Sequence, residues 1–208
     1  MKRFKWISSL VVLFSSLNSA AQVTTNQLQK GDILFIGTSG KLSKAIDKVT
    51  QTNQSTNFTH MGIVVSTELG IWVLHADPKL GVVKEDLTEF ANNNKVAVYR
   101  LKENKQNVIE NALNDFSKYL GHPYNSTYII EDKGYYCSEL IYELFATDSI
   151  FQLQPMTFKN PQTGKFNKTW IKHYQKLGIE IPEGKPGCNP NEMATNTSLM
   201  YMGNLRQK

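Results

Sequence analysis

The chain has 208 residues, of which 40% are hydrophobic and 20% are charged. This length suits one compact domain, and the composition is that of an ordinary globular protein rather than a collagen, a coiled coil or a disordered tail. The formal net charge is +5, but Lys2, Arg3 and Lys5 supply three of these charges, and residues 22–208 have a net charge of only +2. Because the remaining Lys and Arg residues are scattered along the chain, the charge pattern predicts no nucleic-acid partner.

The first 21 residues have the pattern of a secretory signal peptide. Three basic residues precede an apolar run from Trp6 to Leu17, and small residues at 19–21 precede a predicted mature N-terminus at Gln22. The run is too short to cross a bilayer comfortably, and an uncleaved anchor is the alternative that would associate the protein with a membrane. We therefore expect export to the periplasm or the extracellular space, and a single domain over residues 22–208.

Hydrophobic periodicity beyond the signal predicts strands first and helices later. In chain order, the patterns indicate a strand at 33–36, a helix at 42–49, strands at 58–66, 71–76, 82–83 and 96–101, helices at 107–120, 137–147 and 169–177, and a short strand at 199–202. Strands followed by helices are typical of an α+β fold with a mainly antiparallel sheet.

The chain contains two cysteines, Cys137 and Cys188. A disulfide is one alternative in an exported protein, but Cys188 lies in a Gly- and Pro-rich stretch, whereas Cys137 starts an amphipathic helix pattern. A cysteine on an apolar helix face is often a small buried hydrophobe. The helix start favours chemistry instead, because unpaired backbone N–H groups and the helix dipole lower a thiol pKa there and can stabilise an oxyanion.

A thiol nucleophile needs a base, and the chain has four histidines. His122 lies in a Gly-His-Pro turn, and His173 lies on the last predicted helix, where a solvent-facing imidazole is expected. His60 and His75 differ from these two because both lie on strand patterns with apolar neighbours.

The four-residue turn predicted between these two strands sets their pairing. It pairs Ser66 with Ile71 and places Gly62 opposite His75, so that His60, Gly62 and His75 share one face of the sheet. The two histidines are then diagonal neighbours, with Gly62 leaving room between them. A slip of one residue would send His75 to the other face.

Together these residues predict a Cys–His–His triad. Cys137 is the nucleophile, His60 is the base that takes its proton and returns it to the leaving amine, and His75 holds His60 in the required tautomer. Asp77 and Glu139 are the alternative carboxylates for that orienting role. A metal site built from the same Cys and His residues is a weaker alternative because no short C-x-x-C or H-x-x-x-H spacing occurs, and we expect no cofactor.

Several motifs resemble those of the NlpC family of cell-wall cysteine peptidases: GDILF at 31–35, THMGIV at 59–64, LHA at 74–76, GHPY at 121–124 and YCSEL at 136–140. In that family the first of these histidines is the base, the second is the third member of the triad, and the cysteine starts the nucleophile helix. Here both histidines precede the cysteine, and this inverted order resembles the circularly permuted YiiX-like branch, whose members often have Glu in place of His75. The resemblance covers roughly residues 30–147 and leaves the C-terminal third unassigned.

The resemblance implies a papain-like fold, with the nucleophile helix packed against a small antiparallel sheet, and amide hydrolysis. NlpC relatives typically cleave γ-D-glutamyl linkages in peptidoglycan stem peptides, and permuted members also act on lipid amides or as acyltransferases. Expected export favours peptidoglycan, with Trp72, Tyr124 and Tyr136 as predicted cleft walls. The alternatives are a lipid-amide hydrolase or acyltransferase of the same fold, and a catalytically silent domain that binds a peptide or lipid.

Overall fold

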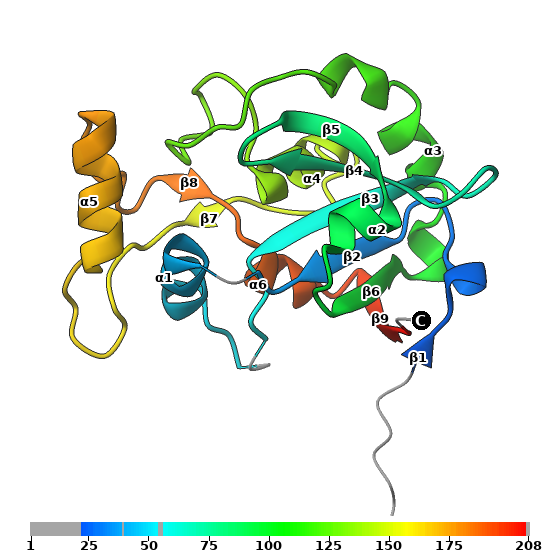
Figure 1. Cartoon of the computed structure of the whole chain (residues 1–208), viewed down its shortest axis with the longest axis horizontal. Helices are drawn as coiled ribbons and strands as arrows, with labels where there is room; N and C mark the ends of the chain where they lie inside the picture. Colours follow the sequence, from blue (N-terminus) through cyan, green and yellow to red (C-terminus); the bar gives the residue numbers. More distant parts are fainter. Residues whose placement is uncertain (1–21, 39, 54–55, 207–208) are drawn as a thin grey trace, which may run out of the picture.

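The computed structural model describes residues 22–38, 40–53 and 56–206, and its centre is a seven-stranded sheet (Figure 1). The strand order is β1-β9-β6-β2-β3-β4-β5, and every neighbouring pair except β1 and β9 is antiparallel. The strands are β1 (Gln22–Val23), β2 (Ile33–Ile36), β3 (His60–Ser66), β4 (Trp72–Asp77), β5 (Gly81–Asp86), β6 (Val96–Leu101) and β9 (Leu199–Leu205). The predicted α+β class with a mainly antiparallel sheet is confirmed.

Helices and a second, two-stranded sheet surround this centre. The small sheet pairs β7 (Gln154–Pro155) with β8 (Pro186–Gly187). The helices are α1 (Lys41–Val49), α2 (Leu87–Ala91), α3 (Val108–Leu113), α4 (Cys137–Leu144), α5 (Lys168–Leu177) and α6 (Pro190–Ala194).

The helix predicted at 107–120 is interrupted. α3 ends at Leu113, and a 3-10 turn covers Phe116–Tyr119. Asp115 between them has φ −131° and ψ 40°, outside the helical region. Asn114 and Asp115 favour such a break because their short polar side chains compete for backbone hydrogen bonds.

Side chains of β3 and β4 alternate between two hydrophobic clusters, one on each face of the sheet. Met61 and Leu74 belong to the larger cluster, on the side where α4 packs against both strands. Val64 and Val73 belong to the smaller cluster, which contains Phe90 of α2. This alternation follows from the two-residue period of a strand.

The pairing of β3 with β4 has the predicted register in the middle of the strands, where Ile63 pairs with Leu74. Near the turn the prediction is wrong, because a bulge shifts the pairing and Ser66 lies opposite Trp72 instead of Ile71. The bulge lies beyond the part of β3 that bears His60, so it does not change the face on which the histidines lie.

The C-terminal third, which the sequence left unassigned, completes the sheet. β9 pairs with both β6 and β1, so both ends of the described chain meet at one edge of the sheet, and α6 packs against α4 (Figure 1). None of the helices in the described ranges is long and apolar enough to cross a membrane. The predicted signal peptide lies outside the described residues.

Candidate active site

Cys137 is the first residue of α4, and its thiol is buried. Burial raises the pKa of this thiol to about 12, although hydrogen bonds from the backbone N–H groups of Met61, Ser138 and Cys137 itself act in the opposite direction. The thiol is therefore protonated at neutral pH. The predicted net lowering of the thiol pKa is wrong, because the effect of the helix start is present but burial outweighs it.

A buried carboxyl group fixes the start of α4. Glu139 Oε2 accepts hydrogen bonds from the backbone N–H of Tyr136 at 3.0 Å and from Asn125 Nδ2 at 3.1 Å. Burial raises the pKa of Glu139 to about 8, and these hydrogen bonds lower it in part. Glu139, predicted as an alternative orienter of the base, instead caps the nucleophile helix.

The two histidines predicted to be neighbours form a direct hydrogen bond. His60 Nε2 lies 2.9 Å from His75 Nδ1, and His75 Nε2 lies 3.0 Å from Glu85 Oε2. Burial lowers the pKa of His60 to about 3. Burial also lowers the pKa of His75, while Glu85 and Asp77 act to raise it. Both imidazoles are therefore neutral at neutral pH.

This chain of hydrogen bonds defines the tautomer of each ring. A carboxylate only accepts hydrogen bonds, so His75 donates from Nε2 to Glu85 and accepts at Nδ1. His60 must then donate from Nε2, which leaves its Nδ1 unprotonated and able to take a proton. The orienting role predicted for His75 fits this geometry.

Glu85 is a member of this chain that the sequence reasoning missed, since Asp77 was proposed in its place. Asp77 Oδ1 accepts hydrogen bonds from the backbone N–H groups of Lys79 and Leu80 at 2.7 and 2.9 Å, and so holds the turn between β4 and β5. On β5, Val83 pairs with His75, and Glu85 is two residues further along the same face. Extending the strand predicted at 82–83 and pairing it with β4 would have identified Glu85.

Gly62 lies between the two histidines in the sheet, but the space left by its missing side chain is filled by groups other than the imidazoles. A Cβ at this position would lie 2.7 Å from Val73 Cγ1, 2.9 Å from Phe90 Cε2 and 3.0 Å from the carbonyl oxygen of Leu74. The ring of Phe90 in turn packs against both imidazoles, with centroid distances of 5.7 Å to His60 and 5.1 Å to His75. Gly62 therefore allows the close packing of Phe90 that holds the imidazoles.

The other two histidines have structural contacts. The carbonyl oxygen of His122 accepts a hydrogen bond from the backbone N–H of Val82 at 2.8 Å, which fits its predicted turn role. His173 was expected to face solvent, but it is partly buried, and its Nε2 lies 2.7 Å from the carbonyl oxygen of Ser126.

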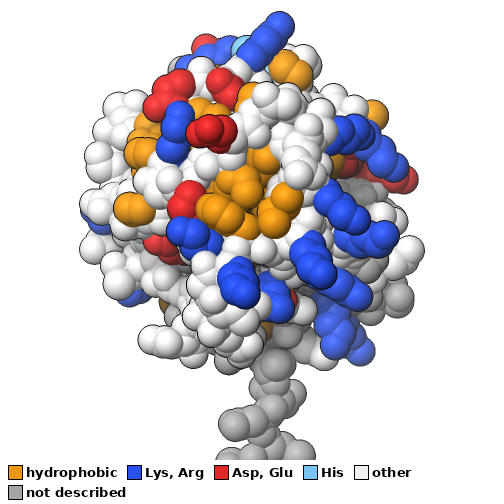
Figure 2. All heavy atoms as spheres, turned by 90° about the vertical axis from the view of Figure 1, so that its left-hand side faces the viewer, with side chains coloured by type: hydrophobic (Ala, Val, Ile, Leu, Met, Phe, Trp, Pro, Cys, Tyr) orange, Lys and Arg blue, Asp and Glu red, His pale blue; other side chains and the backbone are white. Residues whose placement is uncertain are grey.

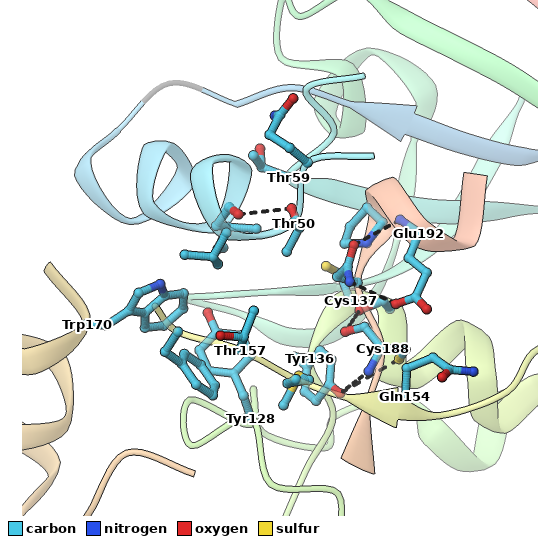
Figure 3. Close-up of a pocket in the computed structure, with 18 of the residues that line it drawn as sticks. Thr50, Thr59, Tyr128, Tyr136, Cys137, Gln154, Thr157, Trp170, Cys188 and Glu192 are labelled. Carbon is cyan, nitrogen blue, oxygen red and sulfur yellow. Dashed lines mark hydrogen bonds between the residues drawn. The ribbon is translucent and has the colours of Figure 1, made fainter. Parts of the chain in front are cut away.

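A cavity of about 330 Å³ opens beside Cys137 (Figure 3). Its walls come from α1, from the segment at 154–158 and from the segment at 188–192, together with five aromatic side chains: Tyr124, Tyr128, Tyr136, Phe158 and Trp170. Among the residues that line it, Glu192 is the one with a formal charge at neutral pH, and no Lys or Arg is present. The cavity is therefore largely apolar, and its size is at the lower end of ligand sites, which span roughly 300–1,000 Å³.

A second cavity of about 220 Å³ is lined by His60, His75 and Glu85. Thr59, Tyr124 and two other residues line both cavities, so Cys137 and His60 lie on either side of a shared wall. Thr59 directly precedes His60, and Met61, whose N–H hydrogen bonds to the thiol, directly follows it. The first residues of β3 thus connect the two parts of the candidate site.

The predicted cleft walls have three different positions. Tyr124 lines both cavities, as predicted for a substrate contact. Tyr136 lines the larger cavity, and its hydroxyl accepts a hydrogen bond from the backbone N–H of Cys188 at 3.2 Å. Trp72 lies under Lys84, with Nζ 5.0 Å from the ring centroid, and lines neither cavity. Because Trp72 lies three residues from His75 on β4, its side chain is on the opposite face of the sheet from that imidazole, where it packs against the larger hydrophobic cluster, and its role as a cleft wall stays a prediction.

The structure has Cys137 and Cys188 as free, buried thiols, so the alternative of a disulfide is not realised. Both line the larger cavity, and Ser138 Oγ donates a hydrogen bond to the carbonyl oxygen of Cys188 at 3.1 Å. Burial raises the pKa of Cys188 to about 12. Cys188 was unassigned by the sequence, and it is a wall of the cavity.

The chain matches a known protein family. Residues 27–202 match the family described as "Permuted papain-like amidase enzyme, YaeF/YiiX, C92 family". The chain belongs to this family. It is therefore an enzyme of a papain-like cysteine amidase family, and the family membership extends through the C-terminal third, beyond the motifs identified in the sequence.

The fold is also found in a solved structure. The chain is similar to the protein described as "metalloprotein yiiX from Escherichia coli O157:H7", with a TM-score of 0.65 and 22% sequence identity over 83% of this chain and 95% of that one. A likeness at this identity shows a common fold. Among curated proteins, no match was found.

Proposed function

We propose that the chain hydrolyses an amide bond with Cys137 as nucleophile, His60 as base, and His75 and Glu85 as positioning residues. The observation that supports this most strongly is the hydrogen-bonded chain from Glu85 through His75 to His60. This chain uses Nε2 of His60 and leaves its Nδ1 free to take a proton. His60 directly precedes Met61, whose backbone N–H hydrogen bonds to the thiol of Cys137.

The pKa values of Cys137 and His60 indicate where the proton lies before the reaction starts. With the thiol pKa raised to about 12 and the His60 pKa lowered to about 3, the resting pair is neutral. His60 Nδ1 takes the thiol proton as sulfur attacks the carbonyl carbon, and the carbonyl oxygen becomes an oxyanion. Backbone N–H groups at the start of α4 and at Met61 are the nearest donors for that oxyanion.

The remaining steps return the enzyme to its starting state. The C–N bond breaks as His60 gives its proton to the leaving amine, and a thioester remains on Cys137. A water molecule, deprotonated by His60, then attacks the thioester, releases a carboxylic acid and restores the thiol. If an amine or hydroxyl takes the place of this water, the same site performs acyl transfer.

Two substrate classes compete for this site. Peptidoglycan stem peptides remain a proposal that rests on the predicted export. They present several carboxylates, which usually bind Arg or Lys, and the larger cavity has none. The lining of the cavity favours the second class, amides with an apolar acyl group. We infer that the acyl part lies among the aromatic side chains, with its carbonyl carbon at Cys137.

A metal-dependent reaction is not part of this proposal, although the similar solved structure is described as a metalloprotein. No group of three or more Cys, His, Asp or Glu side chains within the described ranges is arranged to hold a metal ion. The facing nitrogen atoms of His60 and His75 are already used in their mutual hydrogen bond.

The test is a panel of muropeptides and N-acyl amides incubated with the wild type, Cys137→Ala and Cys188→Ala. The proposal predicts hydrolysis by the wild type and Cys188→Ala and none by Cys137→Ala, with N-acyl amides cleaved faster than muropeptides. Cys188 is the matched control because its thiol lines the same cavity. If the wild type binds these compounds without cleaving any, the chain is a silent binding domain.

A further inference from the structure

Two helices wall the cavity beside Cys137 and also present lysines to solvent. Ile46 and Val49 of α1 and Trp170 of α5 line the cavity, and the two helices pack against each other. Each therefore has one side facing the cavity and another facing outward. The outward side has a distinct chemistry.

Three exposed lysines lie on the outward side of each helix. We call this set the basic helix face: Lys41, Lys44 and Lys48 of α1 and Lys168, Lys172 and Lys176 of α5. Spacings of three or four residues place the lysines of each helix on one side, opposite the residues that line the cavity. Asp47 is the one acidic residue in the two helices.

The charge of this face exceeds that of the protein as a whole. The six lysines and Asp47 give the two helices a net charge of +5, whereas residues 22–208 together have +2. Residues 22–208 outside these two helices therefore have a net negative charge. The salt bridges found among the described residues involve none of the six lysines.

The mouth of the cavity lies at this same side. Its exposed lining residues are Gln51, just after α1, and Gln154, Pro155 and Thr157, in the segment that leads toward α5. Figure 2 shows this side of the molecule, where a central group of hydrophobic side chains has Lys and Arg along one flank and Asp and Glu at its upper edge.

We propose that the basic helix face docks the protein on an anionic lipid bilayer and brings the mouth of the cavity to that surface. Lysines beside the mouth of an apolar cavity match a bilayer with acidic headgroups above an apolar interior. An acidic peptide or a wall polymer would use the lysines but not the apolar cavity beside them. Docking itself does not depend on catalysis, whereas delivery of an acyl amide to Cys137 rests on the proposed function.

The experiment is co-sedimentation of the full chain with phosphatidylcholine vesicles, with and without phosphatidylglycerol. We compare the wild type, Cys137→Ala, a triple variant with Lys168, Lys172 and Lys176 changed to Glu, and a control triple variant. The control changes Lys95, Lys102 and Lys105 to Glu as well. These are exposed lysines next to β6, and both triple variants therefore have the same net charge. The first 21 residues are identical in all four proteins and do not account for a difference between them.

The expected result is binding to phosphatidylglycerol vesicles that weakens with added salt. The α5 variant should lose more than about tenfold in affinity, and the control less than about threefold, since only the α5 lysines would lie against the anionic surface. Thermal unfolding checks that both variants fold. Equal losses in the two triple variants, no wild-type binding to anionic vesicles, or binding to isolated cell wall without binding to vesicles would each overturn the proposal.

The design separates docking from the proposed function. Cys137→Ala should bind vesicles as the wild type does, because the nucleophile lies in the cavity and not on the basic helix face. Vesicle binding without hydrolysis of any amide would refute the proposed function and leave docking intact. Hydrolysis without vesicle binding would refute docking alone.

Discussion

His60 and His75 lie on adjacent antiparallel strands with His60 Nε2 2.9 Å from His75 Nδ1. Because His75 also binds Glu85 through its other nitrogen, the proton positions in both rings follow from one carboxylate. His60, the proposed base, is thus oriented by two groups in series, and the effect of removing each should diminish with distance from the thiol.

His60→Ala should lower kcat by roughly 10²–10⁴-fold, because it removes the base itself. His75→Ala should cost less, and Glu85→Gln less again, because each leaves the base in place and relaxes only its tautomer. For both positioning variants we expect the loss in kcat with little change in KM. Steady-state kinetics on one amide substrate measures the series, and a Glu85→Gln loss as large as that of His60→Ala would contradict this order.

The relation between the rate and pH should reflect a neutral thiol–imidazole pair. Since burial lowers the pKa of His60 to about 3 and raises that of Cys137 to about 12, neither group titrates between these values in the free enzyme. We expect kcat/KM to be flat from about pH 5 to about pH 9, as these plots report free-enzyme pKa values. A rising limb centred near the ordinary pKa of histidine or cysteine would show that the pair ionises before substrate binds.

The same pKa values affect thiol alkylation. A protonated, buried thiol should react with iodoacetamide more slowly than free cysteine, even if Cys137 is the nucleophile. Slow alkylation therefore does not distinguish the enzyme from a silent binding domain, and hydrolysis must be measured directly.

Glu139→Gln should stabilise the protein as the pH rises. Burial raises the pKa of Glu139 to about 8 from an ordinary value of 4.5, so the folded state holds a proton that the unfolded state releases. Its stabilising effect is complete below the unfolded pKa and is lost as the pH rises through the folded pKa. Glutamine keeps an acceptor for Tyr136 and Asn125 without this loss.

Denaturant unfolding of both proteins at a series of pH values measures the effect. The free energy of unfolding of Glu139→Gln relative to the wild type should increase from about pH 5 to about pH 8.5. A difference that is constant over this range would show that Glu139 is already ionised in the folded protein.

Gly62→Ala should reduce both stability and activity. The added methyl group would lie within 3.0 Å of Val73 and Phe90, so the protein should lose about 1–3 kcal/mol from overpacking. Displacement of Phe90 should also loosen both imidazoles and lower kcat.

Adding Val73→Ala removes one of the two side chains that crowd the added methyl group. The double variant should then be less destabilised than the sum of the single variants. Strict additivity would indicate that Gly62 has no packing role beside the histidines.

The sequence predicted those features that depend on local periodicity. The two-residue period of β3 and β4 placed His60 and His75 on one face, and the helix pattern after Cys137 placed the cysteine at a helix start. The same period, applied to Trp72, would have placed it on the opposite face from His75. The order of the motifs predicted the family from roughly residues 30–147, whereas the family match extends over residues 27–202.

Features that depend on tertiary packing could not be predicted. The raised thiol pKa results from burial by segments far away in the sequence, including the wall that contains Cys188. Glu85 was missed for a different reason: only two residues of β5 were predicted, so the pairing with β4 that places Glu85 beside His75 was not considered. The carboxyl group of Glu139 depends for its role on Asn125, which belongs to the loop before α4.

The central claim is that the acyl group passes through a thioester on Cys137. The measurement is acid quenching during turnover of whichever amide the panel shows to be cleaved, followed by intact-protein mass spectrometry and peptide mapping. We predict one acyl group on Cys137 in the wild type and in Cys188→Ala, and none in Cys137→Ala, which should also be inactive. Turnover by Cys137→Ala at the wild-type rate, or an acyl group mapped to Cys188 instead, would contradict the account.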